Sequence, residues 1–280
     1  MTATPSSERL GGRRSRLADL PARIAFAIPA AALAIAIVAL GGAAFAAGAG
    51  AIAVLALVEA YRLLSVPRQV AAAGGLALVA MVVAGLLEGR EALAPALAAG
   101  VVLIFVAAVA PGAGPRRRTA TIAVAVLGLV WVGFGATHAV LIRELPHGGG
   151  LILDLLLAVF IGDTAAHILG SLWGRRPLAA TISPSKTVEG LAAGILAAVA
   201  TPVAVAAIAQ PWLPLGDAAL IGLAAGLAAP AGDLFESLVK RDAGVKDSGR
   251  LLGPHGGVLD RVDAVLFASV AGFYVAVALL

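Results

Sequence analysis

The sequence contains no cysteine, only 5% of its 280 residues are aromatic, and only 13% are charged. Without cysteine there is no disulfide, no thiolate metal site and no thiol nucleophile. Soluble domains carry about 25% charged residues, whereas 61% of this chain is hydrophobic and its mean hydropathy is +1.01. The composition therefore predicts an integral membrane protein. The formal net charge is only +4, which we interpret as membrane orientation, so we expect no nucleic-acid partner.

Long apolar runs, separated by glycine, proline or charged residues, fill most of the chain. A helix needs about 20 apolar residues to cross the hydrocarbon core, and a membrane-spanning chain without other backbone partners must be helical. We therefore predict an all-α integral membrane protein, a polytopic bundle of about nine transmembrane helices. The first should be an uncleaved anchor, because its basic start lacks a small-residue cleavage site. The predicted spans are 24–43, 46–64, 69–87, 92–110, 119–141, 150–172, 188–209, 216–239 and 262–280.

The basic residues alternate along this set of spans. Of the twenty Lys and Arg residues, only Arg90 and Arg143 fall outside the N-terminal tail and every second loop. Because Lys and Arg accumulate in cytoplasmic loops, this asymmetry predicts a cytoplasmic N-terminus and an outside C-terminus. The predicted regions are a basic cytoplasmic tail (1–23), a five-span hydrophobic region (24–142), and a four-span region (150–280) with cytoplasmic loops at 173–187 and 240–261.

Charged residues inside the last four spans occur in pairs on single helix faces. Asp163 and His167 are four positions apart, whereas the carboxylate pairs of the eighth and ninth spans are three apart; both spacings place two side chains on one face. An intramembrane carboxylate costs roughly 2.5–3.5 kcal/mol and normally faces a cavity or a partner. We therefore predict a polar, catalytic site between the C-terminal helices. The carboxylates of the two later pairs are Asp233, Glu236, Asp260 and Asp263.

A structural interpretation of these carboxylates as internal salt bridges stays open. Asp260 could pair with Arg250, and Glu236 with Lys240. In the first five spans, Glu59 lies three residues before Arg62, which favours an interfacial ion pair on the helix surface. His138, near the end of the fifth span, is interpreted as a capping or interfacial residue rather than a ligand.

Two predicted cytoplasmic loops combine cations, hydroxyls and glycines. The first reads GRRPLAATISPSKTVEG and the second KRDAGVKDSGRLLGPHGG. Backbone N–H groups, hydroxyls and cations are what phosphate oxygens bind, and helix N-termini favour anions. Hard carboxylate oxygens without cysteine suit Mg²⁺, which takes one or two carboxylates together with substrate phosphates. We therefore predict phosphoryl or nucleotidyl transfer on a lipid, with a Mg²⁺ shell supplied by Asp233, Asp260 and Asp263.

The same residues carry a family resemblance. The segment SLVKRDAGVKDSGRLLGPHGGVLDRVD, residues 237–263, resembles the signature of the phosphatidate cytidylyltransferases, also called CDP-diglyceride synthetases. SPSKTVEG, residues 183–190, is similar to a second element of that family. DTAAHILG, residues 163–170, matches more loosely, since the family has Gly where Ala165 stands and Tyr where His167 stands. The resemblance covers roughly residues 155–280.

The resemblance implies the reaction of CTP with phosphatidate to give CDP-diacylglycerol and pyrophosphate. It implies a multi-pass enzyme of phospholipid biosynthesis in a bacterial-type cytoplasmic membrane, with its active site facing the cytoplasm. Mg²⁺, with K⁺ as a candidate second cation, and a homodimer are implied, with CTP, phosphatidate and membrane lipids as partners. Asp233 and Asp260 are the leading metal ligands and Asp263 the next. The resemblance assigns phosphate or substrate contacts to Ser183, Lys186, Thr187, Ser237, Lys240, Arg241, Lys246 and Arg261. It assigns supporting roles to Asp163, Glu189, Glu236 and Asp247. It assigns proton transfer or phosphate binding to His255.

Two alternatives remain at this stage. Another CTP-dependent lipid phosphotransferase, such as a lipid-alcohol kinase, would use the same kinds of residue. A CDP-alcohol phosphotransferase is disfavoured, because its Asp-Gly-x-x-Ala-Arg element is missing. An ion transporter could use Asp163, Asp233 and Asp260 as an ion path, but it would not need the Lys-, Ser- and Gly-rich loops.

Overall fold

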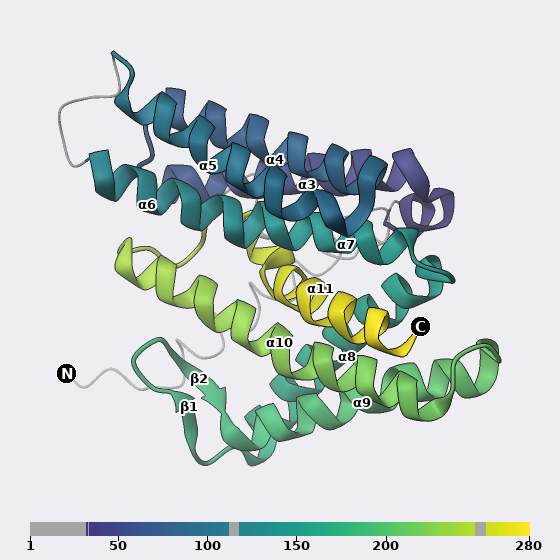
Figure 1. Ribbon diagram of the computed structural model, residues 1–280. Helices are drawn as coiled ribbons and strands as arrows, with labels where there is room; N and C mark the ends of the chain where they lie inside the picture. The colour runs from purple at the N-terminus through teal and green to yellow at the C-terminus, as the bar shows by residue number, and fades with distance from the viewer. Residues whose placement is uncertain (1–31, 33, 112–117, 250–255) are drawn as a thin grey trace, which may run out of the picture.

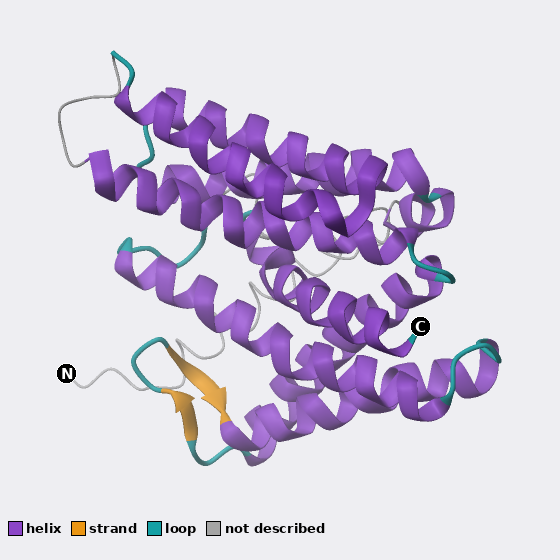
Figure 2. Ribbon diagram, viewed as in Figure 1, coloured by secondary structure: helices purple, strands orange, loops and turns teal. Residues whose placement is uncertain are grey.

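The protein is seen in a computed structural model that describes residues 32, 34–111, 118–249 and 256–280. Seven helical runs in these residues have the length and apolar composition to cross a membrane. Helices dominate the view in Figure 2, and the only strands among the described residues form one small hairpin. The predicted all-α polytopic membrane fold is confirmed. The runs are Gly42–Leu63, Arg68–Val109, Arg118–Glu144, Gly148–Trp173, Val188–Ala209, Leu215–Asp242 and Leu259–Leu279.

Two of these runs are composite. The second contains α4 (Arg68–Glu88) and α5 (Leu93–Val109), separated by the 3₁₀ turn η1 (Gly89–Ala92). Gly89 has φ 72°, a conformation that favours glycine, and the two helices pack against each other. The run therefore supplies the two predicted spans 69–87 and 92–110.

The third run forms one predicted span. It joins α6 (Arg118–Gly128) through the π-helical turn η2 (Leu129–Phe134) to α7 (Gly135–Glu144). The other runs are the single helices α3 (Gly42–Leu63), α8 (Gly148–Trp173), α9 (Val188–Ala209), α10 (Leu215–Asp242) and α11 (Leu259–Leu279).

The predicted spans from 46–64 onward agree with these helices to within about four residues. The first, 24–43, lies partly outside the described residues, so the total of nine and the side of each terminus stay predictions. One boundary needs correction, because α11 begins at Leu259 and not at residue 262. Asp260 therefore belongs to the first turn of that helix.

The helices form two groups with α11 between them (Figure 1). Helices α3 to α7 lie together in the upper part of the view, and α8, α9 and α10 in the lower part. Helix α11 packs against α7 and α3 on one side and against α10 and α8 on the other. This position brings the N-terminal half of the chain into contact with the helix that carries Asp260 and Asp263.

Small residues allow the C-terminal helices to approach closely. At Gly232 on α10, an added Cβ would overlap the backbone oxygen of Asp263 on α11. A Cβ added at Gly226 on α10 would lie only 3.0 Å from the Cβ of Ala198 on α9. Helix association in membranes depends on such close packing, because lipid supplies no hydrophobic drive. The glycines of α10 thus bring its polar side chains close to α11.

The loop between α8 and α9, predicted only as a cytoplasmic loop at 173–187, contains an antiparallel hairpin. Its strands are β1 (Pro177–Ala179) and β2 (Ser183–Thr187), with Pro177 paired to Thr187 and Ala179 to Ser183 (Figure 2). The hairpin lies at the same end of the bundle as the C-terminal end of α10 (Figure 1). It carries Lys186 toward α10.

Candidate active site

One face of α10 carries the polar side chains on which the site is built. The first is Asp233, and Glu236, Ser237 and Lys240 come three, four and seven positions after it. This spacing places all of them on one side of a helix. Helix α10 packs against both α9 and α11, so its polar side chains lie close to these two helices.

The hairpin supplies the first ion pair of the site. Lys186 Nζ lies 2.5 Å from Asp233 Oδ2, and the two side chains are 25% and 33% exposed. Ser237 donates a longer hydrogen bond to Asp233 Oδ1, at 3.4 Å. The structure therefore brings together two sequence elements, around residues 186 and 233, that the motif analysis assigned to the same site.

A second cation joins α10 to α11. Lys240 Nζ lies 2.5 Å from Glu236 Oε2 and 2.7 Å from Asp260 Oδ1. Glu236 is only 1% exposed, and Asp263 is also buried. The pair between Glu236 and Lys240, left open as a structural interpretation of the sequence, is present. Asp260 pairs with this lysine, whereas Arg250 lies outside the described residues.

Asp260 is also the centre of a hydrogen-bonded loop. Its Oδ2 accepts from Gly257 N at 2.7 Å, from Ser248 Oγ at 2.9 Å and from Ser248 N at 3.1 Å. With the lysine contact, this carboxylate holds the end of α10, the loop that follows it and the start of α11. A carboxylate at the start of a helix also interacts favourably with the helix dipole.

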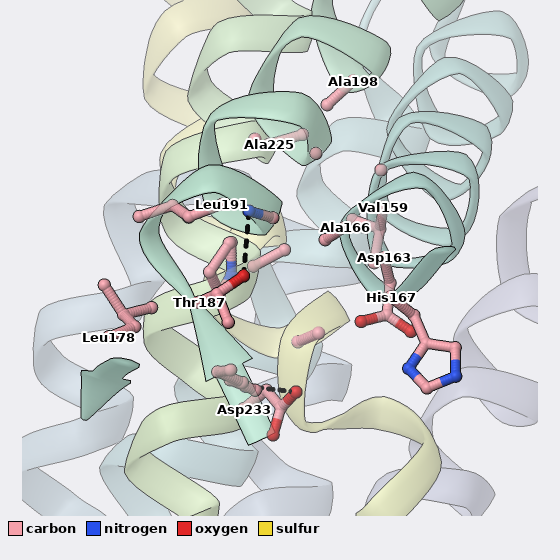
Figure 3. Close-up of a pocket in the computed structure, with 18 of the residues that line it drawn as sticks. Val159, Asp163, Ala166, His167, Leu178, Thr187, Leu191, Ala198, Ala225 and Asp233 are labelled. Carbon is pink, nitrogen blue, oxygen red and sulfur yellow. Dashed lines mark hydrogen bonds and ion pairs between the residues drawn. The ribbon is translucent and has the colours of Figure 1, made fainter. Parts of the chain in front are cut away.

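A cavity of about 340 Å³ opens between α8, α9 and α10 beside these pairs (Figure 3). One part is polar and is lined by Asp163, His167, Ser185, Lys186, Thr187 and Asp233. The remainder is lined by glycine, alanine and aliphatic residues, including Val159, Gly194, Ala198, Ala225 and Gly226. The cavity is therefore amphipathic: a charged group fits one part and an apolar chain the other.

Asp163 and His167 lie across the cavity from Thr187 in Figure 3. Asp163 is within electrostatic range of Asp233 and Lys186. The structure thus places Asp163 of α8 and Asp233 of α10 in the same cavity as Lys186, and the supporting role of Asp163 stays a prediction.

The start of α9 is held by its own side chains. Thr187 is the N-cap, and its hydroxyl accepts from Gly190 N at 3.1 Å. Glu189 Oε2 accepts from the backbone N–H groups of Arg175 and Arg176, at 3.0 and 3.2 Å. Such caps are typical of helix N-termini. Thr187 also lines the cavity, whereas Glu189 holds the hairpin to the helix.

Other predicted residues lie around the site rather than in it. Arg241 donates to the backbone oxygens of Ile182 and Val245, so it joins α10 to the hairpin turn. Lys246, Asp247 and Arg261 are exposed at the same end. Ser183 does not line the cavity, but Ser185 does. His255 lies outside the described residues.

Two interpretations of the N-terminal half need correction. Glu59 is 4% exposed and accepts from Leu259 N at 2.9 Å, and no ion pair among the described residues joins it to the exposed Arg62. His138 is fully buried, with Nδ1 2.8 Å from Phe134 O and its ring against Phe273. Both residues lie inside the protein because α11 packs against the N-terminal helices, which no local pattern reveals.

The site offers carboxylate oxygens as donors for a cation such as Mg²⁺. Within the described parts of the chain, no three His, Cys, Asp or Glu side chains are close enough to form a metal cage. Asp233 and Asp263 are nevertheless within electrostatic range of each other, and all the carboxylates offer hard oxygen donors. Mg²⁺ commonly takes one or two carboxylates and completes its shell with substrate phosphates. The residues therefore fit a cation that is held jointly with a phosphorylated substrate.

Comparison with known proteins gives consistent matches. A family model described as "Cytidylyltransferase family" matches residues 21–280. The chain is 34% identical over 164 residues to a phosphatidate cytidylyltransferase of Mycobacterium bovis, covering 58% of this chain and 52% of that protein.

Two further relatives show similar coverage. A phosphatidate cytidylyltransferase of Staphylococcus epidermidis is 37% identical over 141 residues, 50% of this chain and 54% of its own. The uncharacterized protein YnbB of Escherichia coli is 38% identical over 152 residues, 52% and 51% of the two chains. The chain thus spans about half the length of the curated relatives it matches.

Proposed function

The chain belongs to the cytidylyltransferase family, and we propose that it catalyses the reaction of CTP with phosphatidate to give CDP-diacylglycerol and pyrophosphate. Relatives named for this activity are 34–37% identical. The observation that carries the proposal is the amphipathic cavity, whose polar part contains Lys186 and Asp233. A lipid phosphate requires a cation for its head group and an apolar surface for its chains, and this cavity offers both.

The nucleotidyl transfer requires that the two substrates are positioned and that their negative charge is neutralised. A phosphate oxygen of phosphatidate attacks the α-phosphorus of CTP, a new P–O bond forms, and the bond to the β-phosphate breaks to release pyrophosphate. The attacking phosphate is already largely ionised near neutral pH, so a strong general base is not needed. The protein's contribution is to hold both substrates in line and to balance their negative charge.

Lys186 and Lys240 would supply that balance. Each now neutralises carboxylates of the site, at 2.5–2.7 Å. When phosphates enter, the ammonium groups would turn toward phosphate oxygens, with which they form charge-assisted hydrogen bonds. Ser185, Thr187 and Ser237 would add hydroxyl contacts, and Arg241 and Lys246 would attract the nucleotide from solvent.

The carboxylates would hold the cation. We propose that one or two of the carboxylates Asp233, Asp260 and Asp263 hold Mg²⁺, with K⁺ as a second cation and with phosphate oxygens completing the shell. The bound cation would neutralise charge on the transferring and leaving phosphates. Asp163 and Glu236 would orient these ligands without binding substrate, as partners around a metal site do.

The proposal includes the membrane arrangement. The hairpin and the end of α10 would face the cytoplasm, where CTP is available, because their loops carry eight of the twenty Lys and Arg residues, whereas the opposite loops carry only Arg90 and Arg143. Phosphatidate would come from the bilayer, and two copies of the chain would form a homodimer.

Product analysis tests the function: purified protein given phosphatidate, CTP and Mg²⁺ should form a lipid with the mass of CDP-diacylglycerol. A phosphorylated lipid alcohol made from CTP would indicate a kinase instead.

A further inference from the structure

Helix α11, which carries Asp260 and Asp263, begins without a cap of its own. Val258 occupies its N-cap position with helix-like φ and ψ of −67° and −39°, and no side chain at that position makes a capping hydrogen bond. The next residue, Leu259, is 0% exposed, so water does not reach its backbone N–H. A buried N–H at a helix start needs a partner from elsewhere.

Glu59, on α3, is that partner. Its Oε2 accepts from Leu259 N at 2.9 Å, across a sequence separation of 200 residues. The side chain is 4% exposed, and its Oε1 has no hydrogen-bond partner among the described residues. A carboxylate is well placed here, because the start of a helix carries partial positive charge. The N-terminal half thus caps the helix that bears the site's carboxylates.

The loop before α11 is shaped around this carboxylate. A Cβ at Gly257 would overlap both Glu59 Oε2 and Ser248 Oγ, and a Cβ at Gly249 would overlap Glu59 Oε1. Gly257 N also donates to Asp260 Oδ2 at 2.7 Å. Gly257 therefore lies between two carboxylates, one from each half of the chain.

We propose that Glu59 is a positioning residue of the active site. It binds the backbone N–H of Leu259 and packs against Gly257, and through them it fixes Asp260 and the hydrogen bond of that carboxylate with Ser248. It does not contact substrate. The proposal rests on the proposed function, and it gives the N-terminal half of the chain a part in catalysis: α3 supplies the cap without which α11 would not hold Asp260 beside Lys240.

The test compares Glu59→Ala with Glu59→Gln in purified full-length protein. Alanine removes the acceptor and should lower kcat about tenfold to a hundredfold, the effect of losing a hydrogen bond to a charged group. Glutamine keeps an oxygen for Leu259 N, so its kcat should stay within about threefold of wild type. The KM for CTP should change little in both, because Lys186 and the hairpin are untouched.

Arg62→Gln is the matched control. It removes a charge from the same turn of α3, and it would reproduce the alanine effect if Glu59 acted through an ion pair with Arg62. We expect wild-type kinetics for Arg62→Gln.

A second perturbation leaves Glu59 in place. Gly249→Ala should lower kcat as Glu59→Ala does, because the new methyl group displaces the carboxylate. This variant keeps the proposal testable if Glu59→Ala fails to fold.

A readout independent of turnover separates this proposal from the proposed function. The chain has no cysteine, so a spin label at Val245→Cys, exposed in the loop after α10, reports on that loop alone. The label should become more mobile in Glu59→Ala and in Gly249→Ala, and unchanged in Arg62→Gln. The proposal is overturned if Glu59→Ala has a normal kcat or an unchanged spectrum. It is also overturned if Arg62→Gln shows a defect equal to that of Glu59→Ala. If wild-type protein makes no CDP-lipid, the proposed function fails, while the spectra still test the contact.

Discussion

Replacing Lys186 with methionine should remove a phosphate ligand while leaving the fold intact. Methionine keeps much of the aliphatic length of lysine and removes only the ammonium group, which lies 2.5 Å from Asp233. Both side chains of the pair are partly exposed, so its loss should cost about 1 kcal/mol of stability or less. That corresponds to a melting-temperature change of only about 2–4 °C. A large loss of activity would therefore report on function.

The catalytic effect should be larger. Losing a hydrogen bond to a charged group costs about 1.5–3 kcal/mol, or about one to two orders of magnitude in kcat/KM. Lys186→Arg should rescue only part of this, because a planar guanidinium does not replace a compact ammonium. Arg175→Met is the matched control, since it removes a cation from the same loop at an exposed position. We expect that control to behave as wild type.

Separate titrations of CTP and phosphatidate, with CDP-lipid as the product measured, would show which substrate Lys186 binds. Our prediction is CTP, because Ser185 and Thr187 offer hydroxyls in the same cavity. Unchanged kinetics for both substrates in Lys186→Met would refute the reasoning. The hairpin would then be a structural element, and the site would reduce to α10, α11 and the loop between them.

Substitutions at three further positions and one topology experiment test other parts of the molecule. Asp260→Asn should nearly abolish turnover while the protein remains folded by thermal denaturation, because it removes the charge opposite Lys240; wild-type turnover would exclude the metal role. Leu191→Trp should raise the KM for long-chain phosphatidate several-fold and leave that for CTP unchanged, since it enlarges a partly exposed apolar side chain that lines the cavity; equal effects on short and long chains would contradict this. Thr187→Val should cost about 1 kcal/mol of stability and Thr187→Ser almost none, as melting temperatures would show. Cysteines at Glu144 and Val245 should react with an impermeant reagent from opposite sides of the membrane, and labelling from one side would break the topology.

Much of the fold could be predicted because a membrane constrains the chain so strongly. Apolar length predicted every described span from 46–64 onward, and the pairs at i, i+3 and i, i+4 predicted which polar residues share a helix face. Charge and hydroxyl content identified the two loops of the site. Lys186, Asp233, Lys240 and Asp260 were thus expected near one another, and the structure places them there.

Contacts between distant helices could not be predicted in the same way. The sequence places Arg62 one turn from Glu59, but it contains no sign that α11 lies against α3 or lacks a cap. The partner of Glu59 depends on tertiary packing, 200 residues along the chain. The hairpin was missed because its strands are short and rich in proline and serine, which are weak signals for a strand.

The most direct test of the central claim follows the phosphates of CTP. Purified protein would receive phosphatidate, Mg²⁺ and CTP labelled at either the α- or the γ-phosphate, with Asp260→Asn as the inactive control. We predict that the α-label enters the lipid and the γ-label leaves as pyrophosphate, and that neither transfer occurs in the control. A lipid carrying the γ-label would mean a kinase, and no labelled lipid from folded wild-type protein would contradict the account.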